Sequence, residues 1–112
     1  MKEVVKIIGG GLAGSEAAYY LAKKGYNVKL YDIKPKSFTP AHKNPLYGEL
    51  VCSNSLKSND VYANACGLLK EEMRILGSMV IECADKTSVP AGAALAVDRD
   101  KFAGAITEKL KS

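Results

Sequence analysis

Residues 6–32 read KIIGGGLAGSEAAYYLAKKGYNVKLYD and contain the pattern that decides the fold. Three glycines form a Gly-x-Gly-x-x-Gly motif, at Gly9, Gly11 and Gly14, after an apolar run and before a helical pattern. In that context the first glycine permits a tight turn, and the second lets a pyrophosphate approach the backbone. The third lets the helix pack closely on the strand. The stretch therefore predicts a strand, a glycine turn, a helix and a second strand, which together form a dinucleotide-binding βαβ unit.

The residues after the motif agree with this interpretation. Ala18 and Leu21 lie on the helical face that should meet the sheet, and Gly25 is expected to end the helix. Asp32 follows Gly14 by 18 residues, close to the spacing of about 20 expected for the acid that hydrogen-bonds an adenosine ribose. An anion is expected at the helix N-terminus. The expected cofactor-binding residues are Gly9, Gly10, Gly11, Leu12, Ala13, Gly14 and Asp32.

Length and composition limit the other possibilities. The 112 residues allow one domain at most, and only two strands can be assigned, whereas a full dinucleotide fold has about six. We therefore expect the first part of a larger protein. A formal charge of +4 is typical of an ordinary solvated surface. Three cysteines without a CxxC pair, and one histidine, predict neither a metal site nor a secreted disulfide scaffold. A cytoplasmic protein with reduced thiols and no membrane span is expected.

Two segments leave alternatives open. Residues 33–45 hold three of the four prolines and four basic side chains, so they form either a solvated linker or a loop that meets phosphates or nucleic acid. Residues 48–59 are rich in small polar side chains around Cys52. A free cysteine is often buried for packing, and a thiol near cations can instead react as thiolate. The residues alone support both interpretations of Cys52.

Helices are expected in the rest of the chain. Asn64 should cap a helix over residues 65–76, with Leu68, Leu69, Met73 and Leu76 inward and Lys70, Glu71 and Arg74 outward. Ser78 should begin a second helix over residues 79–85, and Asp98 a third, whose inward face is Phe102, Ala105, Ile106 and Leu110. Cys66 and Cys83 are expected in the core. The small apolar residues 89–97 suit packing beside a cofactor or the sheet.

Three segments in this order resemble one protein family. They are GGGLAGSEAAYYLAKKGYNVKLYDIKP, then GELVCSNSLKS with ANACGLLKEEMRILGS, then SVPAGAALAVDRDKF. Together they resemble the N-terminal part of the folate- and FAD-dependent tRNA uracil-5-methyltransferases, the TrmFO family, formerly Gid. The glycine segment is shared with many flavoproteins, whereas ELVCSNSL and VPAGAALAVDR are distinctive. Asp32 stands where such flavoproteins more often have glutamate, and the chain is much shorter than family members.

The resemblance implies a fold and an activity. Residues 1–112 would be the N-terminal part of an FAD-binding domain, an α/β fold with a Rossmann-like βαβ unit, helical segments and an incomplete parallel sheet. Family members bind FAD on the glycine turn and take a methylene group from methylenetetrahydrofolate. They reduce it with flavin electrons from NAD(P)H and deliver a methyl group to C5 of a uridine in the tRNA T loop. The flavin-site cysteine of the family maps onto Cys52, which is thereby expected to be catalytic.

Other classes remain as alternatives. One is another FAD-dependent protein, including the related tRNA wobble-uridine modifying group, which shares the glycine turn. A nicotinamide-dependent dehydrogenase would also use this turn. The third is a non-catalytic nucleotide-binding fragment, because too few strands are present for a complete sheet.

Overall fold

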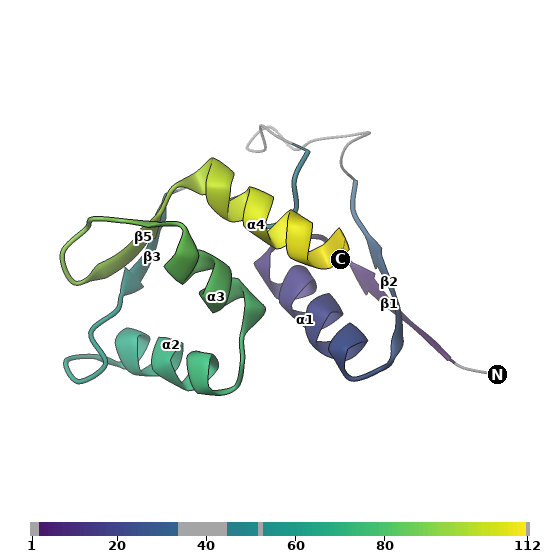
Figure 1. Ribbon diagram of the computed structural model, residues 1–112, viewed down its shortest axis with the longest axis horizontal. Helices are drawn as coiled ribbons and strands as arrows, with labels where there is room; N and C mark the ends of the chain where they lie inside the picture. The colour runs from purple at the N-terminus through teal and green to yellow at the C-terminus, as the bar shows by residue number, and fades with distance from the viewer. Residues whose placement is uncertain (1–2, 34–44, 52, 112) are drawn as a thin grey trace.

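The computed structural model describes residues 3–33, 45–51 and 53–111, and it divides the strands between two sheets (Figure 1). In chain order the elements are β1 (Val4–Ile8), α1 (Leu12–Lys23), β2 (Asn27–Tyr31), β3 (Ser55–Ser58), α2 (Ala65–Ile75), α3 (Met79–Lys86), β4 (Ser88–Val89), β5 (Ala94–Val97) and α4 (Arg99–Lys111). None of the helices in these described ranges has both the length and the apolar character needed to cross a membrane.

The first sheet is the expected parallel pair. β1 and β2 run side by side from Val4 opposite Asn27 to Ile8 opposite Tyr31, and α1 connects them. Gly25 ends the crossover helix as predicted. It has a φ of +91°, and its N–H donates to the Ala22 carbonyl at 3.0 Å. The α/β class and the βαβ unit are confirmed.

The second sheet was not predicted. It is antiparallel in the order β3-β5-β4, so the strand after Asn54 pairs with one about forty residues later. The register between β3 and β5 is irregular, and Lys57 inside β3 has a φ of 70°. Short strands of serine and alanine lack the alternation of apolar and polar residues that marks a strand in sequence.

α4 joins the two halves of the molecule. It runs from the antiparallel sheet to the β1–β2 pair, and α1 and α3 lie beneath it in Figure 1. Phe102 and Ile106 of α4 are fully buried, as the sequence predicts, and they pack with Met79, Cys83 and Val97. The core therefore lies between α3, α4 and β5.

The helix starts agree with the sequence. The Asn64 side chain accepts a hydrogen bond from the Gly67 N–H at 3.1 Å, and Ser78 Oγ accepts one from the Ile81 N–H at 3.1 Å. Asp98 Oδ1 accepts one from the Lys101 N–H at 3.0 Å. These three caps are confirmed, because each depends only on residues within one helical turn.

The predicted orientation of α2 is wrong. Lys70 is buried, with 8% of its surface exposed, whereas Leu68, Leu69, Leu76 and Cys66 are exposed. The Lys70 ammonium donates to the Ser58 carbonyl at 2.9 Å and to the Cys66 carbonyl at 3.3 Å. An apolar side chain would have left the Ser58 carbonyl without this donor, so the neighbouring backbone favours lysine on the inner face.

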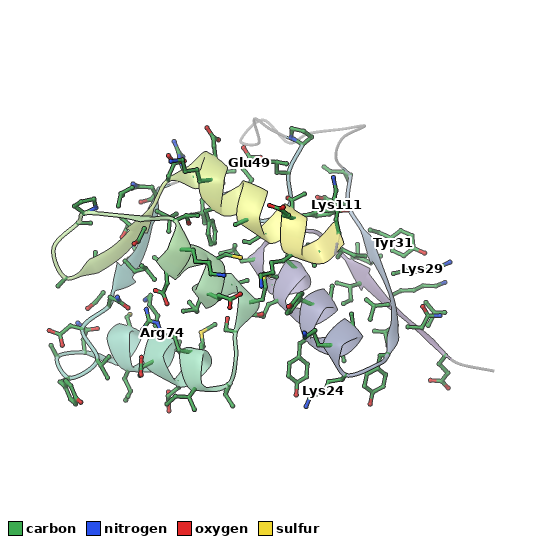
Figure 2. The ribbon with its side chains drawn as sticks, in the orientation of Figure 1. Lys24, Lys29, Tyr31, Glu49, Arg74 and Lys111 are labelled. Carbon is green, nitrogen blue, oxygen red and sulfur yellow. The ribbon has the colours of Figure 1, made fainter. Side chains whose placement is uncertain are left out.

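Arg74 connects α2 to its surroundings. Its Nε and Nη2 donate to the two carboxylate oxygens of Asp85 on α3 at 2.8 and 2.9 Å, and Nη2 also donates to Asn59 Oδ1 at 2.7 Å. This hydrogen bonding to Asp85 raises the pKa of Arg74. Arg74 lies on α2, as Figure 2 shows. The two-point contact links α2 to α3.

Glu16 connects α1 to α3. Its carboxylate accepts a hydrogen bond from Ser78 Oγ and another from the Met79 N–H, the latter at 3.0 Å. The Val80 N–H lies 3.4 Å away as a further donor. A carboxylate at a helix N-terminus satisfies exposed N–H groups and opposes the positive end of the helix dipole. One side chain of α1 thus caps α3, whose N-cap Ser78 lies 62 residues later in the chain.

Replacing Glu16 with alanine should lower the free energy of unfolding by about 1–2 kcal/mol, because the α3 amides lose their acceptor. Glu16→Gln keeps a neutral acceptor and should lose less. Urea unfolding followed by circular dichroism measures both changes. Glu108→Ala, at an exposed position of α4, is the matched control and should change little. Equal losses for Glu16→Ala and Glu108→Ala would contradict the capping role.

Candidate dinucleotide-binding site

The glycine turn is tightly fixed at its two ends. The Gly9 N–H donates to the Tyr31 carbonyl at 2.7 Å, and Gly9 has a φ of +104°, which side chains rarely allow. A Cβ on Gly14 would overlap the Gly9 carbonyl oxygen and lie 3.0 Å from the carbonyl carbon. α1 therefore approaches the end of β1 as closely as the sequence motif requires.

The middle of the turn is open. A Cβ built on Gly11 would meet no atom within 4 Å. Gly11 precedes α1, whose N-terminus has no side-chain cap and no acidic residue in its first turn. The N–H groups of Leu12, Ala13 and Gly14 have no acceptor within the helix, so they and the helix dipole favour an anion there. This cradle fits a pyrophosphate.

Asp32 lies beside the same turn. It directly follows β2, and its Oδ1 accepts a hydrogen bond from the Ile33 N–H at 2.8 Å. A Cβ on Gly10 would lie 2.8 Å from Asp32 Oδ2, so the carboxylate stands against Gly10. The structure thus brings together all seven residues that the sequence proposes for cofactor binding.

Two supporting residues were missed by the sequence analysis. Ser15 is fully buried, and its hydroxyl donates to the Gly10 carbonyl at 3.2 Å. The Gly48 N–H donates to the same carbonyl at 2.8 Å. Gly48 has a φ of +69°, and a Cβ there would lie 2.6 Å from Ile106 Cδ1. Ser15 directly follows the third glycine, so the sequence could have indicated its role in the turn. Nothing near Gly48 in the sequence indicates its hydrogen bond to Gly10.

The candidate catalytic residue Cys52 lies outside the described residues, as does the basic loop from residue 34 to residue 44. The described residues on either side of Cys52 are held at two places. Gly48 is bonded to Gly10, and the Asn54 carbonyl accepts a hydrogen bond from the Val97 N–H at 2.9 Å. Gly48 is therefore held at the glycine turn and Asn54 at β5.

The two other thiols differ in environment. Cys66 is exposed, whereas Cys83 is 1% exposed and in contact with the Met79 sulfur at 3.8 Å. Burial raises the pKa of the Cys83 thiol above its ordinary value. The expected core role is confirmed for Cys83 and wrong for Cys66, which lies on the exposed side of α2.

The glycines at 11 and 14 should respond oppositely to alanine. Gly14→Ala should destabilise the fold by about 1–3 kcal/mol, because the new methyl group meets the Gly9 carbonyl. Gly11→Ala should change stability by less than about 0.5 kcal/mol, yet weaken nucleotide binding by filling the cradle. Thermal unfolding and FAD titration of both variants separate the effects. A destabilised Gly11→Ala variant that still binds FAD would contradict this assignment.

Alkylation should distinguish the two thiols. A raised pKa leaves less thiolate at a given pH, so Cys83 should react with iodoacetamide much more slowly than Cys66 in the folded chain at pH 7.5. In urea the two rates should converge. Mass spectrometry of the labelled peptides measures each site, and equal labelling of the folded chain would show that Cys83 is accessible.

β1, the glycine turn, α1 and β2, with Asp32 after β2, form the βαβ unit of a Rossmann-type fold. A family model described as glucose inhibited division protein A, GIDA, matches residues 4–112. The chain belongs to this family.

Relatives with high identity carry a more specific name. The chain is 61% identical over 112 residues to methylenetetrahydrofolate--tRNA-(uracil-5-)-methyltransferase TrmFO of Desulfotalea psychrophila, covering 100% of this chain and 25% of the relative. The TrmFO of Fusobacterium nucleatum is also 61% identical over 112 residues, covering 100% and 26%. That of Lactobacillus gasseri is 59% identical over 111 residues, covering 99% and 25%. The chain spans about a quarter of the length of these curated relatives.

Proposed function

We propose that residues 1–112 form the N-terminal part of an FAD-binding domain in an enzyme that methylates C5 of uridine in tRNA. The methyl carbon comes from methylenetetrahydrofolate, and NAD(P)H supplies the electrons through the flavin. The identity of 57–61% to TrmFO proteins along nearly the whole chain is the observation that carries this proposal.

The described residues suit the FAD role. The Gly11 cradle and the uncapped N-terminus of α1 suit the pyrophosphate. Asp32 stands where a ribose hydroxyl would donate to it, and its charge opposes a 2′-phosphate. The same geometry also suits the adenosine diphosphate half of a nicotinamide cofactor, so the choice of FAD depends on the relatives.

When bound, the flavin supplies the two electrons that convert a transferred methylene group into a methyl group. The new carbon–carbon bond forms at C5 of uridine, and the C5 proton is released. In this proposal Cys52 acts as a thiolate nucleophile toward an electrophilic ring. The hydrogen bond of Gly48 supports this role, because it holds a residue four positions before Cys52 at the glycine turn. Such an enzyme would act on tRNA in the cytoplasm.

FAD binding tests the first part of the proposal. The purified chain should bind FAD and release oxidised flavin, with a yellow colour, on denaturation. Quenching of flavin fluorescence on titration measures the affinity. Bound NAD in a colourless protein would instead indicate a dehydrogenase, and absence of nucleotide binding would refute the cofactor assignment.

Methyl transfer needs the rest of the protein, so a chimera tests it. Replacing the matching quarter of Fusobacterium nucleatum TrmFO with this chain should give an enzyme that forms 5-methyluridine in unmodified tRNA. Cys52→Ala in the chimera should lower the rate at least about 100-fold, in line with loss of a nucleophile. Cys66→Ala, at an exposed thiol, is the matched control and should keep the rate. Nucleoside analysis measures the product, and unchanged turnover by Cys52→Ala would exclude its chemical role.

A further inference from the structure

Tyr47 is held beside the glycine turn by its own backbone and by the next residue. Its N–H donates to Thr107 Oγ1 of α4 at 2.9 Å, and the Gly48 N–H donates to the Gly10 carbonyl at 2.8 Å. Gly48 is buried against Ile106. Tyr47 is therefore fixed between α4 and the turn, although it is 37 residues from Gly10 in the sequence.

The Tyr47 ring and the Asp32 carboxylate both lie on the side of Gly10 where a side chain would project. A Cβ on Gly10 would lie 2.8 Å from Tyr47 Cε1, nearer still to Cδ1, and 2.8 Å from Asp32 Oδ2. An aromatic ring thus stands beside the carboxylate that directly follows β2. No residue other than glycine fits at position 10 while both groups keep these places.

The ring is only partly covered by protein. Tyr47 is half-buried, and it lines a cavity of about 530 Å³ together with Val28 and Leu30 of β2. The side chain contacts the core, while its Cδ1 and Cε1 atoms face Gly10 of the turn. A ring of this kind can supply a flat apolar surface to a ligand.

We propose that Tyr47 positions the adenosine half of the bound dinucleotide. This inference rests on the proposed nucleotide-binding function. The ring packs against the ribose and adenine, while Asp32 accepts hydrogen bonds from the ribose hydroxyls. By excluding water from one side of the carboxylate, the ring also strengthens those hydrogen bonds. Stacking of a base on an aromatic side chain is typically worth a factor of about 5 to 150 in affinity.

Two variants and two ligands test the role. In the full chain, Tyr47→Leu should keep the packing against the core and weaken ADP and FAD binding about tenfold, whereas Tyr47→Phe should bind both normally. Inorganic pyrophosphate occupies the turn without adenosine, so its affinity should not change in either variant. Tyr19→Leu is the matched control, since Tyr19 packs on the same core and lines the same cavity.

Displacement of FAD, followed by its fluorescence, gives all these affinities, and thermal unfolding shows that the variants are folded. Unchanged ADP binding by Tyr47→Leu would overturn the inference. Equal weakening of ADP and pyrophosphate would also overturn it, because it would indicate only a loosened turn. Failure of the unsubstituted chain to bind FAD or ADP would instead refute the proposed function itself.

Discussion

The hydrogen bond from the Gly48 N–H to the Gly10 carbonyl holds the two halves of the structure together at the site. It brings the chain back over the glycine turn after β2. From there the chain passes through Cys52 to β3, which pairs with β5. Gly48 also packs against Ile106 in the core. A local feature of the turn, the carbonyl of Gly10, is therefore linked through Gly48 to the packing of α4.

Much of the nucleotide-binding half could be predicted because its signals are local. The spacing of Gly9, Gly11 and Gly14, the end of α1 at Gly25 and the helix caps each depend on neighbours within a few residues. The other half depends on contacts between distant segments. Pairing of β3 with β5 places serines opposite alanines without a recognisable pattern. Tyr47 and Lys70 acquire their positions from partners that no spacing in the sequence indicates.

The faces of the two sheets differ in how much of the protein packs against them. α1 packs on one face of the β1–β2 pair, whereas Lys29 and Tyr31 point away from it in Figure 2, and Ile8 on the same outer face is 81% exposed. Parallel sheets are normally buried on both faces. Within the described residues the outer face of this pair is left uncovered, whereas the core around α3 and α4 is buried.

The Glu16 cap also affects the order in which the chain folds. Its partners Ser78 and Met79 follow 62 and 63 residues later, and Phe102 and Ile106 later still. On a ribosome, α1 would emerge well before the groups that hold it, and the βαβ unit alone would bury little apolar surface. Contacts of such long sequence separation slow folding. The groups that hold α1 thus follow it by at least 62 residues, so the glycine turn at its N-terminus reaches its final packing late in folding.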